Sequence, residues 1–388
     1  MSTQVGRALT QDAGEPRLVL HLGAPKCGSS SVQAALSRRP DFMSRTGRPI
    51  SYLVATANAA ITGARIRTIA EMSDFGYASS SALQGEAGPR VLSSLERGVA
   101  AVQARGRLPV LSSEGWLTRS QAFLDSGVLK RLGGGTHVVI SVRPPLDWMN
   151  AAWWQWGVWS DGGLDRFLAA CVPQARWGML ARRWAAVPGV EAVHLRLADR
   201  DAVGALFDVL DAAPPDAASI NTSLPSGLLA LLTRNRDLRP GPHESAIEFR
   251  LARALASAPP PPDGPSLWAL DSARQEEAWT RLRFHPRQIG PLLPDEDRAR
   301  LRRDRRWFGP EGYADRPVVM PRDLETPEAL TALHDWLAAA AGQKPAAAPL
   351  PDVTTADSAI RPILGRLTQD RAAVLSRLWR LSRLARKS

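Results

Sequence analysis

The sequence predicts an α/β protein with a mostly parallel central sheet flanked by helices. Short apolar runs that are typical of buried strands alternate with longer segments in which apolar residues recur at helical spacing. This alternation favours parallel pairing, because a parallel neighbour is reached only through a crossover connection, usually a helix. The expected strands are residues 18–22, 108–114, 137–142 and 191–197.

The first strand leads into a tight loop and then a helix, over residues 18–36, LVLHLGAPKCGSSSVQAAL. A glycine-rich loop that enters a helix directs backbone N–H groups, and the positive end of the helix dipole, at one point in space. This stretch is therefore a candidate site for a phosphate-like or sulfate-like anion, although a glycine turn without a ligand has a similar composition. Its residues are Pro25, Lys26, Cys27, Gly28, Ser29, Ser30 and Ser31.

The order of residues in the loop separates it from a Walker A motif. In that motif the lysine follows the last glycine and is followed by the hydroxyl residue that holds magnesium. Here Lys26 precedes Gly28, so the loop is a relative of the P-loop, and no metal is expected. Cys27 is either a small side chain that fills the tight turn, the interpretation we favour, or a reactive thiol at a helix N-terminus.

Two later strands also end in side chains that suit such a site. The run 108–114 ends in two serines and Glu114, and a carboxylate at the carboxyl end of a parallel strand is a candidate base. A helix-capping or solvated carboxylate is an equally acceptable interpretation of Glu114. The run 137–142 leads directly into Arg143 and two prolines, where a guanidinium can bind a phosphate through two hydrogen bonds.

These motifs resemble those of the sulfotransferases that use 3′-phosphoadenosine 5′-phosphosulfate (PAPS), in particular the bacterial members. The resemblance rests on Pro-Lys-x-Gly-Ser-Ser after the first strand and on Arg-x-Pro after a later one. It implies a P-loop-like sulfotransferase architecture, in which the loop holds the 5′-phosphosulfate and Arg143 binds the 3′-phosphate. It also implies that Lys26 stabilises charge on the bridging oxygen and that Glu114, like the glutamate of the heparan-type enzymes, takes the proton of the acceptor.

One family position differs in this chain. The family serine that follows the arginine by eight residues, and that also binds the 3′-phosphate, is replaced by Ala151, and the neighbouring Asn150 is the candidate substitute. The resemblance implies transfer of a sulfuryl group from PAPS, as co-substrate, to a hydroxyl of a carbohydrate or another small acceptor. The alternatives are a P-loop kinase or nucleotide hydrolase, and a non-catalytic nucleotide-binding scaffold.

Much of the remaining chain is predicted to be helical. Residues 148–159 contain five tryptophans, for which core packing is favoured over a stacking platform for the acceptor. Apolar residues recur at helical spacing in several further segments. These predicted helices are residues 91–104, 164–188, 201–210, 224–235 and 245–255.

The distribution of charge argues against a nucleic-acid partner. The formal net charge is +11, but residues 365–388 alone contain seven cations and one anion. The rest of the chain therefore carries a modest positive excess, which suits anionic small molecules. The sequence contains no apolar run near the ~20 residues that span a bilayer, and residues 1–17 have no secretory signal, so a cytoplasmic location is expected.

The predicted organisation has four parts. Residues 1–17 are expected to be a disordered leader, residues 18–341 the α/β domain, and residues 342–362 a Pro/Ala-rich linker. Residues 363–388 form a predicted basic amphipathic helix, a C-terminal extension that can lie on the anionic inner membrane surface, dock on a partner or pack on its own domain. The sequence predicts neither the oligomeric state nor the identity of the acceptor.

Overall fold

The chain folds into two compact units, each assembled from three separate segments. The computed structural model describes residues 14–198, 201–215, 224–283 and 285–384, with side chains as far as residue 368. The single domain predicted over residues 18–341 differs from this division, because the chain leaves the first unit and returns to it twice. The first unit comprises the described parts of Met1–Ala152, Asp165–Ile220 and Ser272–Ala314, and the second those of Trp153–Leu164, Asn221–Asp271 and Asp315–Ser388.

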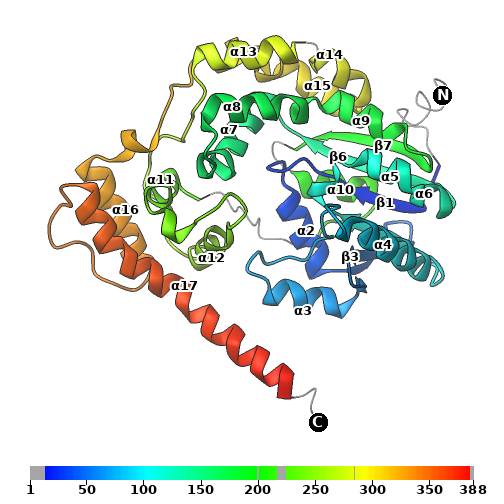
Figure 1. Cartoon of the computed structure of the whole chain (residues 1–388), viewed down its shortest axis with the longest axis horizontal. Helices are drawn as coiled ribbons and strands as arrows, with labels where there is room; N and C mark the ends of the chain where they lie inside the picture. Colours follow the sequence, from blue (N-terminus) through cyan, green and yellow to red (C-terminus); the bar gives the residue numbers. More distant parts are fainter. Residues whose placement is uncertain (1–13, 199–200, 216–223, 284, 385–388) are drawn as a thin grey trace. The chain divides into compact units, whose positions relative to one another are not determined.

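A seven-stranded sheet forms the centre of the first unit (Figure 1). The strands follow the order β2-β3-β5-β1-β6-β7, and β4 pairs with β3. All pairs from β3 to β7 are parallel, whereas β2 and β4 run antiparallel to β3, so the predicted α/β class with a mostly parallel sheet is confirmed. The strands are β1 (Leu18–His21), β2 (Asp41–Met43), β3 (Pro49–Ala55), β4 (Ala60–Thr62), β5 (Leu108–Ser112), β6 (Thr136–Val142) and β7 (Val190–Leu197).

β3 is a parallel strand that the sequence analysis missed. Its apolar run contains Ser51, which is buried in the sheet. The structure tolerates this serine because its hydroxyl donates a hydrogen bond to Oδ1 of Asp41 on β2, at 2.6 Å. β3 is therefore held in the sheet by pairing with β2 on one edge and with β5 on the other, and neither pairing can be predicted from its own residues.

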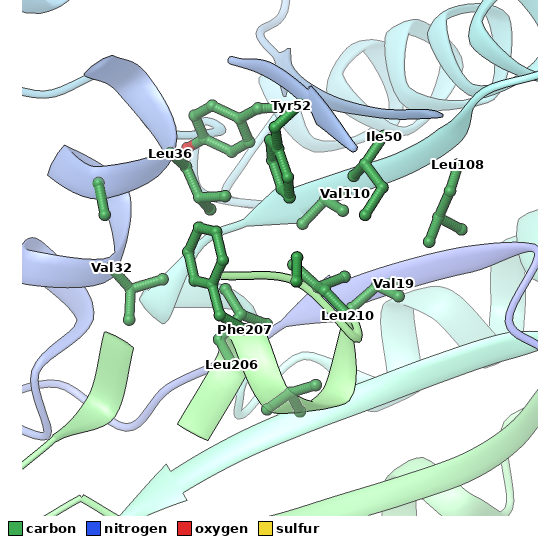
Figure 2. Packing of buried hydrophobic residues seen from close by; sticks show 14 of the residues in the cluster. Val19, Val32, Leu36, Ile50, Tyr52, Leu108, Val110, Leu206, Phe207 and Leu210 are labelled. Atoms are coloured by element: carbon green, nitrogen blue, oxygen red, sulfur yellow. The ribbon is translucent and has the colours of Figure 1, made fainter. Parts of the chain in front are cut away.

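Helices cover both faces of the sheet. On one face, α2 (Ser29–Arg38) and α10 (Ala202–Val209) pack on Val19, Tyr52 and Val110, in the core that Figure 2 shows. On the other face, Gly98 of α4 (Ala87–Gln103) lies against Leu53, which alternates with Tyr52 along β3 and so points the opposite way. Both faces are therefore buried, as the continuous apolar strands require.

Several shorter helices lie wholly or partly in the first unit. They connect the strands or follow the sheet in the sequence. Their bounds are α3 (Ala64–Met72), α5 (Ser120–Ser126), α6 (Val128–Arg131), α7 (Pro145–Gln155), α8 (Gly163–Cys171), α9 (Trp177–Ala185), α13 (Ser272–Leu282), α14 (His285–Ile289) and α15 (Asp295–Arg303).

The second unit is helical in its described residues, apart from one bridge between Trp268 and Val319. Its apolar core brings together residues such as Leu231, Leu337 and Ile360. None of the helices within the described residues combines the length and the apolar character needed to cross a bilayer. The helices of this unit are α11 (Ser226–Arg234), α12 (Ala246–Ala254), α16 (Pro327–Ala340) and α17 (Val353–Leu384).

The predicted boundary between linker and C-terminal helix differs from the structure. Helix α17 begins at Val353, ten residues before the predicted start, and contains Pro362. Ala356 and Ile360 are buried at helical spacing in the second unit, and this packing stabilises the first turns despite the proline. Residues 1–13 of the predicted leader, residues 385–388 and the side chains beyond residue 368 lie outside the described part of the chain.

Candidate functional site

The candidate site lies at the carboxyl ends of three neighbouring parallel strands. β1 lies between β5 and β6 in the sheet. After β1 the chain passes to the β3 side of the sheet, and after β6 it passes to β7 on the other side, so the connections diverge beside β1. Ligands of open α/β sheets bind in the crevice at such a point. Glu114, the loop after β1 and Arg143 follow β5, β1 and β6 respectively, as the sequence predicts.

The loop turns sharply through two residues in the left-handed region. Lys26 has a φ of 61° and Gly28 a φ of 85°. Gly28 is the N-cap of α2, and a Cβ atom at this position would lie only 2.4 Å from Cβ of Ala202 on α10. No side chain caps the helix at Gly28 in the described structure. The first turn of α2 therefore has N–H groups that an anion can accept from.

Arg143 is held against the loop. Its Nη1 donates a hydrogen bond to the carbonyl oxygen of Lys26 at 3.2 Å, and the side chain is half-buried. The other guanidinium N–H groups point from the same planar fork, which is the geometry that binds phosphate oxygens. Arg143 and the loop, for which the resemblance implies contacts with the same cofactor, are therefore in direct contact with each other.

Two tryptophans hold the loop and Arg143 in position through hydrogen bonds to their backbone carbonyl groups. Nε1 of Trp148 on α7 donates to the carbonyl oxygen of Pro25 at 2.8 Å, and Nε1 of Trp177 on α9 donates to the carbonyl oxygen of Arg143 at 3.1 Å. Their rings pack edge to face, with centroids 5.3 Å apart. Both are buried, so Trp148, from the aromatic stretch of the sequence, has the packing role that we favoured.

Glu114 lies close enough to Lys26 for the two charges to interact. Glu114 begins a short 3-10 helix, Glu114–Trp116, directly after β5. Burial raises the pKa of its carboxyl group, and the positive charge of Lys26 opposes that shift. A carboxylate with a raised pKa beside a cation is the arrangement expected of a general base in a partly water-excluded site.

Tyr77 is a site residue that the sequence analysis did not identify. The Oγ of Ser30 donates to the hydroxyl oxygen of Tyr77 at 3.4 Å. Burial raises the pKa of Tyr77 to about 12, with a smaller contribution from the negative charge of Glu114. Tyr77 is therefore neutral at physiological pH, accepts a hydrogen bond from Ser30 and lies near enough to Glu114 for the charge of that carboxylate to affect its pKa.

The three serines of the motif have different surroundings. Ser29 is buried, and its hydroxyl donates to the carbonyl oxygens of Gly23 at 3.1 Å and Ala24 at 3.3 Å. Its side chain thus closes the loop on itself, and its backbone N–H is the group left for a ligand. Ser30 and Ser31 are half-buried in the first turn of α2, where their side chains remain candidates for ligand contact.

Cys27 is buried within the loop. Its side chain is about 1% exposed, and burial raises the pKa of its thiol to about 12. The thiol is therefore protonated at neutral pH and is a poor nucleophile. This agrees with the interpretation of Cys27 as a small side chain that fills the turn.

Asn150 and Ala151 point in different directions on α7. Asn150 is buried, with 7% of its surface exposed, whereas Ala151 is half-buried. Successive helical residues are about 100° apart around the axis, so Asn150 does not occupy the direction that a serine at position 151 would have. Asn150 remains a predicted cofactor contact. It would reach the cofactor from a different face of α7 than the serine that sulfotransferases have at the position of Ala151.

His21 lies directly beneath the loop and was also missed by the sequence analysis. Its Nδ1 lies 2.8 Å from Oγ of Ser112 on β5. A Cβ atom on Gly23 would lie 2.7 Å from Nε2 of His21, so the loop can pass over the ring only with glycine at this position. Burial lowers the pKa of His21 to about 4, and the neutral ring supports the loop without placing a charge under it.

Comparison of the chain with protein-family models, with curated proteins and with solved structures gives no match. Within the described residues, no group of three or more His, Cys, Asp or Glu side chains is arranged to hold a metal ion. The case for a function therefore rests on the geometry of the loop, Glu114 and Arg143.

Proposed function

We propose that the protein is a P-loop-like sulfotransferase, which transfers the sulfuryl group of PAPS to a hydroxyl of a carbohydrate or another small acceptor. The observation that carries the proposal is the meeting of three groups at adjacent strand ends. Arg143 contacts the carbonyl of Lys26, and Lys26 interacts with the charge of Glu114. The guanidinium of Arg143 and the carboxylate of Glu114 thus lie beside the loop that contains Lys26.

The residues present fit the anionic donor. The left-handed turn at Lys26 and Gly28 and the uncapped first turn of α2 supply backbone donors for the 5′-phosphosulfate. Gly28 makes room for this path, because a side chain there would collide with Ala202. Arg143 would bind the 3′-phosphate through the part of its guanidinium that does not face Lys26.

The transfer step needs one base and one group that stabilises negative charge. Glu114 would accept the hydroxyl proton of the acceptor as its oxygen forms a bond to sulfur. The bond from sulfur to the bridging oxygen breaks at the same time, and its electron pair stays on 3′-phosphoadenosine 5′-phosphate. Lys26 would stabilise the charge that develops on that oxygen. The proton, the sulfuryl group and the electron pair are thereby all assigned.

The proposal is tested by turnover of PAPS in the full-length protein with a pool of hydroxylated acceptors, followed as release of 3′-phosphoadenosine 5′-phosphate. Lys26→Ala is expected to lower the rate about 100-fold, the usual cost of removing a group that stabilises transition-state charge. Lys130→Ala is the matched control, because Lys130 is an exposed lysine on α6. Equal rates in the parent and Lys26→Ala proteins would contradict the proposal.

Glu114→Gln separates binding from chemistry. The amide keeps the size of the side chain but cannot take a proton, so transfer should be lost while 3′-phosphoadenosine 5′-phosphate still binds. Magnesium-dependent ATP hydrolysis without turnover of PAPS would instead favour the kinase or hydrolase alternative. Nucleotide binding without transfer to any acceptor would favour the scaffold.

A further inference from the structure

A cavity in the first unit, lined by none of the candidate-site residues, is rimmed by arginines. It has a volume of about 330 Å³ and is lined by residues of α9, α13 and α14 and of the turn before α9. Three exposed guanidinium side chains, those of Arg176, Arg182 and Arg281, stand around it. Met179 and Leu282 add an apolar wall. No part of the loop after β1 lines this cavity, so it is separate from the site described above.

His285 supplies a buried polar group to the same cavity. Its side chain is 2% exposed, yet neither ring nitrogen makes a hydrogen bond of normal geometry to a described residue. Burial lowers the pKa of the ring to about 3, and the backbone of Ala175 has a smaller, opposite effect on that pKa. The ring is therefore neutral at physiological pH, and among the described residues the backbone of Ala175 is the polar group that acts on its N–H.

The imidazole ring is held in a fixed orientation. It stacks on Trp307, with centroids 5.7 Å apart and planes 15° apart, and it meets the ring of Trp177 edge to face at 6.3 Å. A ring clamped by two buried tryptophans cannot turn toward solvent to satisfy its nitrogens. Both ring nitrogens are enclosed by protein, so the ring contributes a rigid, neutral wall to the cavity.

The charges around the cavity leave a positive excess. Nη2 of Arg281 pairs with Glu277 at 3.2 Å, and Nη2 of Arg176 lies 3.5 Å from the carbonyl oxygen of Arg281. Arg182 makes no side-chain hydrogen bond or ion pair with the residues that the structure describes. Among the described residues, Arg281 is thus the one of the three arginines that is paired with a carboxylate, and Glu277 is itself largely exposed.

We propose that this cavity is a second anion site, which binds a small molecule that combines a phosphate or sulfate group with a short apolar body. The guanidinium groups would donate to the anionic oxygens. The apolar body would pack on Met179 and Leu282. The inference does not depend on the proposed transferase activity, because none of its residues belongs to the loop, Glu114 or Arg143.

Phenyl phosphate and phenyl sulfate, titrated calorimetrically into the full-length protein, test the inference and distinguish the two anions. Arg182→Ala should weaken binding of the preferred probe by about tenfold or more, as expected for loss of hydrogen bonds to a charged group. Arg183→Ala is the matched control, since Arg183 is the next residue of α9, is exposed and does not line the cavity. Lys26→Ala should leave this binding unchanged.

The imidazole signals of His285, assigned by comparison with His285→Gln, provide a second readout. The probe should shift these signals in the parent and Arg183→Ala proteins, and much less in Arg182→Ala. The inference is overturned if neither probe binds at millimolar concentration. It is also overturned if binding survives Arg182→Ala but is lost in Lys26→Ala, because the probe would then occupy the loop after β1.

Discussion

Gly28 shows how one residue determines the shape of the candidate site. It has a positive φ, and its α-carbon faces Ala202 of α10 so closely that hydrogen is the only substituent that fits. Glycine is therefore required here for two separate reasons, the left-handed backbone conformation and the close packing against α10. The sequence motif specifies a glycine here, but the collision with α10 depends on a helix that follows it by more than 170 residues.

Gly28→Ala should therefore lower the free energy of unfolding by about 2 to 4 kcal/mol, of which about 1 kcal/mol comes from the left-handed backbone and the rest from the clash. Gly47→Ala is the matched control, because Gly47 has nearly the same φ, 84°, with open space around it. Urea denaturation of the two variants measures the difference. Equal losses of stability would show that the contact with Ala202 has no energetic effect.

His21 predicts a dependence of stability on pH. Its pKa is lowered from 6.5 to about 4 in the folded protein, so the folded state resists protonation. Its contribution to stability is fully present above pH 6.5 and is lost as the pH falls from 6.5 toward 4. The slope is up to about 1.4 kcal/mol per pH unit.

Urea denaturation between pH 7 and pH 5 should therefore show a shallower decrease of stability in His21→Gln than in the parent protein. His243→Gln serves as the control, because His243 is exposed. The assignment fails if the parent and His21→Gln proteins have the same slope over this range.

The helices and strands around the site explain why its residues meet. Glu114, Lys26 and Arg143 are far apart in the sequence but follow three strands that lie side by side in the order β5-β1-β6. Trp148 on α7 and Trp177 on α9 then hold the loop and Arg143 by hydrogen bonds to backbone carbonyl groups. Removing the indole of Trp148 would take the donor from the carbonyl of Pro25, and removing that of Trp177 would take it from the carbonyl of Arg143. Both helices therefore support the site.

Trp177→Phe tests this support. It keeps an aromatic ring but removes the N–H that donates to Arg143, so the affinity for 3′-phosphoadenosine 5′-phosphate should fall by about tenfold. Trp184→Phe removes a comparable buried hydrogen bond, to the carbonyl oxygen of Leu117 at 2.8 Å. Both variants should lose stability, but only Trp177→Phe should lose affinity. An equal affinity in the two variants would assign Trp177 to packing alone.

The strand-loop-helix unit and the polar strand ends could be predicted because their signals are local. Apolar runs, glycines and the Pro-Lys-x-Gly-Ser-Ser order all lie within a few residues of one another. Tyr77 and His21 could not be identified in this way. Tyr77 reaches Ser30 from a distant segment, and His21 resembles any other residue of a buried strand until Ser112 and Gly23 are placed beside it.

At the scale of the molecule, the chain forms two units where one domain was predicted. The second unit uses the start of α17 as part of its core, since Ala356, Ile360, Ile363 and Leu364 are all buried. The Pro/Ala-rich composition before residue 363 predicts a linker there, because composition does not show which alanines and isoleucines are covered by other helices.

A chain that ends at residue 368 should therefore keep the stability of the parent protein in urea denaturation, because it retains the buried residues of α17. A chain that ends at residue 352 should be several kcal/mol less stable, since it loses four buried side chains. If the two truncated chains were equally stable, α17 would not belong to the core of the second unit.

Calorimetric titration of the full-length protein with 3′-phosphoadenosine 5′-phosphate, beside ATP with magnesium, addresses the proposed function most directly. We predict binding of the bisphosphate that is lost in Arg143→Ala and kept in Arg105→Ala, an exposed arginine on the helix turn after α4. Binding of ATP alone, of neither nucleotide, or of the bisphosphate with equal affinity in Arg143→Ala would contradict the proposal that this loop and Arg143 form a PAPS site.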